Sequence, residues 1–181
     1  DWRLTAIDGS TLDLADEKEN VSYFGRPSAS RGKSAFPKLR FAALLEIGTR
    51  AVFAAEMDKY ETSEIVLADK LLDELVPGML CLCDRGFLGF NFYSKALKSG
   101  ADLLLRAKKS CIFPALKRLP DGSFLSKIYA SPSDRKKEHA GVEIRVIEYR
   151  LKGVRNAESK YILVTSILDC QKAPAVELAA L

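Results

Sequence analysis

The chain has 181 residues, of which 48% are hydrophobic and 29% are charged, a balance typical of a domain with a buried core. Its longest apolar runs fall far below the roughly 18 residues that a membrane-spanning helix needs, which excludes such a helix. The start, DWRLTAIDGS, lacks the basic segment and apolar stretch of a secretion signal and has no initiator methionine, so we expect a piece of a longer protein.

The formal charge of +4 is unevenly distributed along the chain. Residues 106–160 contain 14 Lys and Arg against 6 Asp and Glu, whereas the remainder is weakly acidic. A basic segment of this kind favours a polyanionic partner such as a nucleic acid. A solvated charged surface without a partner is the alternative.

The cysteine and histidine content excludes several kinds of site. The spacing of Cys81 and Cys83 is not a zinc pattern, and we expect the four cysteines to be reduced core thiols. The single histidine, His139, lies in a charged stretch, so a two-histidine zinc helix is impossible and a Ser-His-Asp triad is disfavoured. Neither a Walker phosphate loop nor a dinucleotide-binding glycine motif is present.

The first half of the chain predicts strands and one clear helix. Residues 3–8 alternate polar and apolar side chains and predict a strand that ends on Asp8. A mobile basic loop is expected over residues 23–40, followed by a hairpin that turns at Gly48-Thr49. An apolar stripe that stops at Pro-Gly predicts a helix over residues 62–78.

The second half predicts further alternation and then a β-rich stretch. We expect a buried strand over residues 79–84, a helix over 90–99 and another buried strand over 102–108. A hairpin turn over 119–124, long strands over 141–152 and 159–168, and a final helix over 173–181 should follow. The last helix has no closing residue, so the sequence is expected to stop inside it. This order predicts an α/β domain with a mixed sheet and a β-rich insertion.

Two of the predicted strands lead into an aspartate with glycine close behind. These are Asp8-Gly9 and Asp84-Arg85-Gly86, in which the glycine allows a sharp turn and leaves room beside the carboxylate. Two carboxylates on neighbouring strands can share divalent ions, whose oxygen preference suits phosphoryl transfer, although a third acid is then expected. Each aspartate taken alone is also a common turn former or helix cap.

Four short motifs, taken in order along the chain, are specific to one family. The ordered set Ile7-Asp8-Gly9-Ser10, Gly25-Arg26-Pro27, Asp84-Arg85-Gly86-Phe87 and Leu103-Leu104-Leu105-Arg106 resembles the DDE-type transposases of bacterial insertion sequences. The resemblance is to the insertion-sequence-four-like branch, which has a β insertion, and it extends over nearly the whole chain.

That resemblance implies a ribonuclease H-like fold, a mixed sheet flanked by helices with a β-rich insertion after the second catalytic aspartate. It divides the chain into the first part of a catalytic core (1–110), the insertion (111–170) and the start of a helix that leads to a catalytic glutamate (171–181). It implies that Asp8 and Asp84 are catalytic and hold Mg²⁺ or Mn²⁺. It also implies cleavage of DNA at element ends, strand transfer into target DNA, a homodimer assembled on DNA, and a cytoplasmic location.

The third acid of the family lies in a Tyr-Arg-Glu-type motif that this sequence does not contain. Glu177 is on the corresponding helix but in a different local context, so we expect an exposed residue and a chain that is inactive by itself. Two alternatives stay open: a non-catalytic DNA-binding remnant of a decayed element, and a haloacid-dehalogenase-like phosphotransferase. The second is disfavoured because Gly9-Ser10 follow Asp8 where that family expects a further acid.

Basic residues near the two aspartates are the predicted DNA contacts, because Lys and Arg bind phosphate without reading sequence. Tyr23, Phe24, Phe87 and Phe90 can stack on a splayed base or, alternatively, pack at the rim of the core. The basic set comprises Arg26, Arg31, Lys33, Arg85, Arg106, Lys108 and Lys109.

Overall fold

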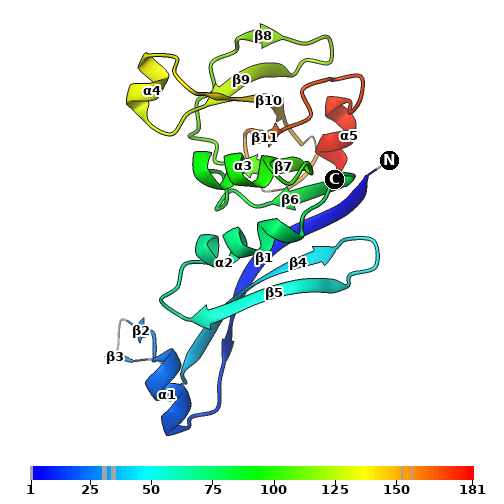
Figure 1. Ribbon diagram of the computed structural model, residues 1–181. Helices are drawn as coiled ribbons and strands as arrows, with labels where there is room; N and C mark the ends of the chain where they lie inside the picture. The colour runs from blue at the N-terminus through cyan, green and yellow to red at the C-terminus, as the bar shows by residue number, and fades with distance from the viewer. Residues whose placement is uncertain (1, 30–31, 34–35, 152, 156) are drawn as a thin grey trace.

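A large mixed sheet forms the centre of the molecule in the computed structural model, which describes residues 2–29, 32–33, 36–151, 153–155 and 157–181 (Figure 1). Among these residues, nine strands form one sheet in the order β5-β4-β1-β6-β7-β11-β10-β9-β8. The five strands of its first half are β5 (Val52–Lys59), β4 (Lys38–Glu46), β1 (Arg3–Asp13), β6 (Met79–Cys83) and β7 (Asp102–Ala107).

The two halves of the sheet differ in strand direction. In the first half β6 and β7 run parallel to β1, while β4 and β5 form an antiparallel hairpin beside β1. The second half is antiparallel and joins the first through the pairing of β11 with β7. Its strands are β8 (Lys117–Arg118), β9 (Phe124–Ile128), β10 (Val142–Tyr149) and β11 (Tyr161–Thr165).

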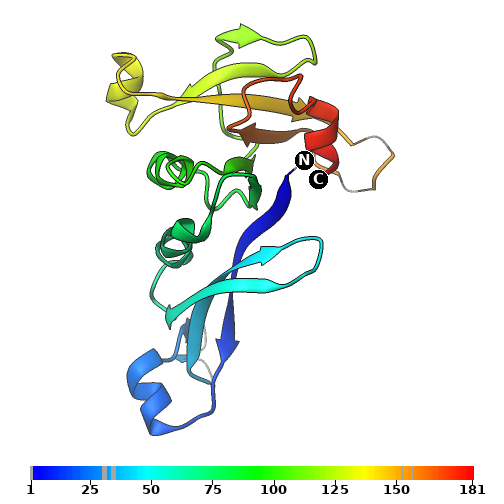
Figure 2. The ribbon, with the colours of Figure 1, turned by 45° about the vertical axis from the view of Figure 1, so that its right-hand side comes forward.

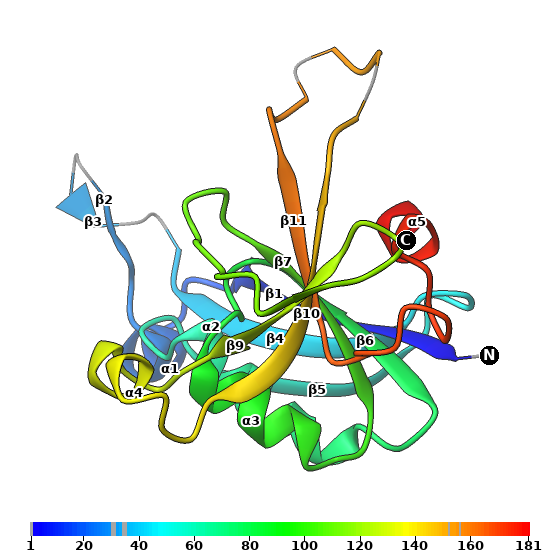
Figure 3. The same ribbon diagram turned by 90° about the horizontal axis from the view of Figure 1, so that it is seen from above.

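Helices cover both faces of the first half. The helix α2 (Glu64–Leu71), the following 3₁₀ turn η1 (Leu72–Glu74) and α3 (Phe90–Leu97) pack on one face, and α5 (Ala175–Ala180) packs on the other (Figure 3). Side chains of β6 alternate between these faces, because Cys81 and Cys83 belong to the core with α2 and α3 whereas Leu80 belongs to the core with α5.

Smaller elements lie at the two ends of the molecule. The helix α1 (Lys18–Phe24) and the short hairpin of β2 (Ser28–Ala29) and β3 (Gly32–Lys33) lie at one end. The strands β8–β11 and the helix α4 (Pro132–Lys136) lie at the other (Figures 1 and 2). No helix in the described part of the chain combines the length and apolar content needed to cross a membrane.

The structure confirms most of the predicted strands and helices, with three differences. β1 extends to Asp13 instead of ending at Asp8, because β4 continues to pair with it as far as Asp13 and Lys38. The helix predicted over residues 62–78 is shorter, and its last part is the 3₁₀ turn η1. The helices α1 and α4 lie where no helix was predicted, and the β2–β3 hairpin lies within the basic stretch that was predicted to be a loop. Ser131 caps α4 by accepting a hydrogen bond from the Asp134 N–H.

A buried arginine ties the second half of the sheet to α5. Arg145 of β10 has no exposed surface, yet its guanidinium donates to Ser123 Oγ at 2.8 Å, Ala173 O at 2.7 Å and Asp121 Oδ2 at 2.5 Å. Asp121 Oδ2 also accepts the backbone N–H of Ala175, the first residue of α5, at 2.9 Å. One carboxylate therefore joins the β8–β9 turn, the centre of β10 and the start of α5.

Arg145→Met should strongly destabilise the fold, because it leaves Asp121 without its cationic partner and the Ala173 carbonyl without its donor. Removing one partner of a buried ion pair costs about 3–5 kcal/mol of the free energy of unfolding, measurable by urea denaturation. Arg3→Met is the matched control, since the exposed Arg3–Glu46 pair at 2.7 Å should contribute no more than about 1 kcal/mol. Equal losses in the two variants would contradict the role given to Arg145.

The same carboxylate should make stability depend on pH. Burial raises the pKa of Asp121, but hydrogen bonds from Ser123 and Ala175 and the charge of Arg145 outweigh burial and hold the pKa below the ordinary value of 3.8. A lowered pKa gives stability that is complete above the ordinary value and is lost as the pH falls through the lowered one. The stability difference between the native chain and Asp121→Asn should therefore shrink on acidification below about pH 4. A difference that stays constant would show that Asp121 does not titrate with folding.

Candidate active site

The register of β1 against β6 brings the two predicted acids together. The last pair of this parallel ladder is Ile7 with Cys83, so Asp8 and Asp84 are each the next residue along their chains. β6 ends there, whereas β1 continues to pair with β4 on its other side. The prediction that Asp8 ends its own strand is therefore wrong. Asp8 lies within β1, at the point where the parallel strand β6 ends.

Both carboxylates line one cavity of about 340 Å³ on the α5 side of the sheet. Asp8 and Asp84 are exposed, and Arg106 and Tyr149 join them in the wall. The remaining wall is largely apolar and comes from β6, β7, β11 and the C-terminal end of the chain, through Leu82, Leu104, Leu163, Leu178, Ala179 and Leu181. The cavity therefore combines two carboxylates and one guanidinium with largely apolar walls.

Gly9 lies at a close approach of the Glu64 side chain and not at a turn. It lies within β1, and a Cβ at this position would come within 2.4 Å of Glu64 Oε1 and 2.6 Å of Glu64 Cγ. Glu64 is in the first turn of α2, so the missing side chain of Gly9 leaves room for the Glu64 side chain directly behind Asp8. The backbone N–H of Gly9 also donates to Asp8 Oδ1 at 2.9 Å.

A cluster of arginine, glutamate and tyrosine side chains lies beside the acids. Arg106 Nη2 is 2.5 Å from Glu158 Oε1, and Arg85 Nη1 is 3.9 Å from the same oxygen. The Arg106 guanidinium lies 5.2 Å from the centre of the Tyr161 ring, which stacks on Tyr149. Sequence reasoning did not identify Glu158, because nothing in its local sequence distinguishes it from other charged loop residues.

The predicted DNA contacts do not form one surface. Arg85 and Arg106 lie near the acids and Lys108 and Lys109 are exposed just beyond β7. Arg26 and the backbone of Lys33 in β3 lie at the end of the molecule that contains α1, away from the acids (Figure 1). Arg26 pairs there with Asp16. Arg31 lies outside the described residues.

The predicted aromatic residues also separate. Phe87 is only 3% exposed and packs against Phe92, with ring centres 5.5 Å apart, so it is a core residue. Tyr23 is exposed, with its ring edge-on to Phe24. Glu177 is exposed in the first turn of α5, as expected.

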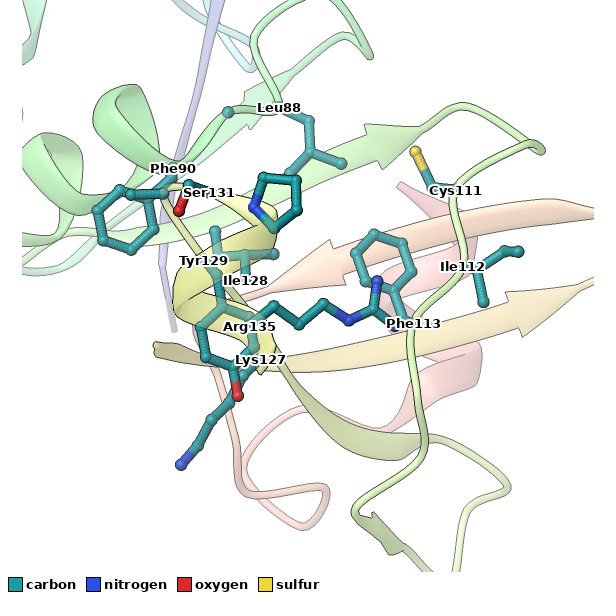
Figure 4. Close-up of a pocket in the computed structure, with 13 residues that line it drawn as sticks. Leu88, Phe90, Cys111, Ile112, Phe113, Lys127, Ile128, Tyr129, Ser131 and Arg135 are labelled. Atoms are coloured by element: carbon teal, nitrogen blue, oxygen red, sulfur yellow. The ribbon is translucent and has the colours of Figure 1, made fainter. Parts of the chain in front are cut away.

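Phe90 lines a second cavity, of about 400 Å³, which the two acids do not reach (Figure 4). Its walls come from the start of α3, the segment after β7, the end of β9 and α4. Most of the lining is apolar, including Phe113 and Tyr129, and Lys127 and Arg135 add positive charge.

The fold is that of a known transposase structure. The chain matches the cryo-EM structure of a piggyBac transposase synaptic complex with hairpin DNA with a TM-score of 0.51 and 12% identity. The match covers 92% of this chain and 34% of that one. At this identity the likeness establishes the mixed α/β fold alone.

Sequence comparison places the chain more specifically, although no protein-family model matches it. It is 25% identical over 181 residues to the transposase InsG for insertion sequence element IS4 of Escherichia coli K12, covering 98% of this chain and 40% of that protein. It is 31% identical over 127 residues to the "Putative transposase InsZ" of the same strain, covering 66% of this chain and 39% of that protein.

The chain is thus similar in sequence to an insertion-sequence transposase and to a putative transposase, in agreement with the resemblance of its motifs. It spans about two fifths of the length of these curated relatives.

Gly9→Ala should destabilise the chain through the contact between β1 and α2. The loss should lie near the low end of the roughly 1–3 kcal/mol that overpacking costs, because only the flexible Glu64 side chain has to move, and urea denaturation can measure it. Glu64→Ala removes the obstructing side chain, so Gly9→Ala should cost much less in the Glu64→Ala background than in the native chain. Equal costs in the two backgrounds would show that Gly9 is needed for a reason other than the approach of Glu64.

Proposed function

We propose that the chain is part of the catalytic domain of a DNA transposase with a ribonuclease H-like core, in which Asp8 and Asp84 hold a divalent metal ion. One observation carries the proposal: the pairing of Ile7 with Cys83 sets the two acids side by side at the mouth of one cavity. Homology to insertion-sequence transposases supports it independently.

The two carboxylates fit the proposed metal in chemistry. Mg²⁺ and Mn²⁺ prefer oxygen ligands, and Mg²⁺ commonly binds through one or two carboxylates while keeping several waters. In the part of the chain that the structure describes, no group of three or more His, Cys, Asp or Glu gathers into a complete site. We therefore expect Asp8 and Asp84 to bind the ion weakly on their own and to supply two members of a larger ligand set.

The proposed reaction is cleavage of DNA at element ends followed by joining of the freed 3′ end to target DNA. Asp8 and Asp84 would hold the divalent ions for this chemistry, and a pair of such ions stabilises the attacking and leaving oxygens of in-line displacements at phosphorus. Arg85 and Arg106 would bind the neighbouring phosphates, and Leu104, Leu163 and Leu178 would form an apolar wall beside the exposed acids.

DNA is the partner that the charge distribution supports. Lys108, Lys109 and the arginines near the acids would supply phosphate contacts on one side of the molecule, and Arg26 on a more distant one. Binding of this kind should weaken steeply with added salt and depend little on base sequence.

Binding of a short mixed-sequence duplex, followed by fluorescence anisotropy, tests the proposal. Mn²⁺ should tighten DNA binding, because an ion held by the two acids would also contact a DNA phosphate. We expect a decrease in Kd of about tenfold, which corresponds to roughly 1.4 kcal/mol of binding free energy. Asp8→Asn and Asp84→Asn should each lose this gain. Asp13→Asn is the matched control, since it removes a charge from the same strand outside the cavity and should keep the gain.

Two results would contradict the proposal. Binding that is equally tight with and without metal, and unaffected by either variant, would favour the non-catalytic DNA-binding remnant. Absence of DNA binding at low salt, from a chain shown to be folded, would remove DNA as the partner of this part of the protein.

A further inference from the structure

Glu158 lies where the two arginines nearest the acids converge. Its Oε1 is 2.5 Å from Arg106 Nη2 and 3.9 Å from Arg85 Nη1, so one carboxylate oxygen faces two guanidinium groups. Arg85 directly follows Asp84, and Arg106 lines the cavity that contains both acids. An anion therefore already occupies the arginine pair beside the candidate active site.

We propose that Arg106 and Arg85 form a phosphodiester-binding site and that Glu158 is its internal occupant, which a DNA phosphate displaces. This inference rests on the proposed function, because it names the group that competes with DNA at the same site. Carboxylate and phosphate both match the planar fork of arginine, so either anion can accept the same hydrogen bonds.

The site is preorganised by contacts that do not involve the Glu158 carboxylate. The guanidinium of Arg106 lies over the Tyr161 ring, and that ring stacks on Tyr149 with centres 5.2 Å apart and planes 21° apart. A cation over an aromatic face is attracted to it whatever its other partner is. Arg106 should therefore keep its place when Glu158 leaves, ready for another anion.

Partial exposure makes the exchange feasible. The side chains of Arg85, Arg106 and Glu158 are 48%, 36% and 34% exposed, so water and an incoming anion can reach the pair. Exposed ion pairs contribute little to stability, whereas an arginine contact to phosphate in DNA adds charge neutralisation and counterion release. Displacing Glu158 should therefore cost little, and the phosphate contact should more than offset that cost.

Competition of this kind predicts that Glu158 weakens anion binding near the acids. Glu158→Gln should bind the phosphate group about two- to fivefold more tightly than the native chain, which is the range expected for removing a partly exposed ion pair. Glu148→Gln is the matched control. It also removes a charge next to the β10–β11 connection, but Glu148 pairs with Lys160, at 2.8 Å, and not with the arginines of the site.

Inorganic phosphate titrated into the folded chain, with the Arg106 Nε–Hε signal followed by NMR, tests the site without DNA. The signal should move at a two- to fivefold lower phosphate concentration in Glu158→Gln and at the native concentration in Glu148→Gln. The inference is overturned if Glu158→Gln and the native chain respond alike, or if Glu148→Gln gains as much as Glu158→Gln.

DNA binding by the same variants separates this inference from the proposed function. Glu158→Gln should bind the duplex more tightly than the native chain, and the gain should disappear in an Arg106→Gln background. A gain that persists in that background would reflect general electrostatics and overturn the inference. If phosphate responds as expected but the chain binds no DNA, the anion site stands and the proposed function fails. If DNA binds but phosphate affinity is unchanged in Glu158→Gln, the inference alone fails.

Discussion

The parallel pairing of β1 with β6 is the constraint on which the site depends. Both strands are held in the centre of the sheet, β1 by β4 and β6 by β7, so their relative register is fixed on both sides. Side chains alternate along a strand, and a slip of one residue would move Asp84 to the opposite face from Asp8. A slip would also exchange Leu80 on one face with Cys81 and Cys83 on the other, and the mismatch in side-chain size would disturb the packing of both cores.

The second half of the sheet completes the cavity that the first half begins. β11 pairs with β7 and supplies Leu163 to the wall, while α5 covers the same face with Leu178 and Ala179. The position of α5 depends in turn on Asp121, which is held by the buried Arg145 and accepts the first N–H of the helix. The β-rich stretch thus extends the sheet and also holds in place the helix that lines the cavity of the two acids.

Local patterns in the sequence were sufficient to predict the elements that bear the acids. The fully apolar run before Asp84 predicted the buried strand β6, and the motifs around Asp8 and Asp84 identified both residues. The full length of β1 could not be predicted, because the residues after Gly9 are mostly polar, with Leu12 exposed, and pair only with β4. The role of Phe87 as a core residue likewise depends on its contact with Phe92 across the turn into α3.

Contacts between distant segments were beyond prediction from local pattern. The alternation in VEIRVIEY predicted a strand, but the buried position of Arg145 depends on a carboxylate 24 residues away. Glu158 meets Arg106 across 52 residues, and only the pairing of β11 with β7 brings them together. The structural roles of Arg145 and Glu158 depend on the residues that they contact, and the order of strands in the sheet determines those contacts.

Paramagnetic broadening by Mn²⁺ is the most direct measurement of whether Asp8 and Asp84 hold one ion. At low Mn²⁺ concentration, the amide NMR signals of residues 7–9 and 83–85 should broaden together, because both strand segments lie beside the same ion. In Asp84→Asn the broadening should decrease at both segments, including the one that was not altered. Broadening that stays at residues 7–9 in this variant, or that centres on another acidic part of the chain, would contradict a shared metal site.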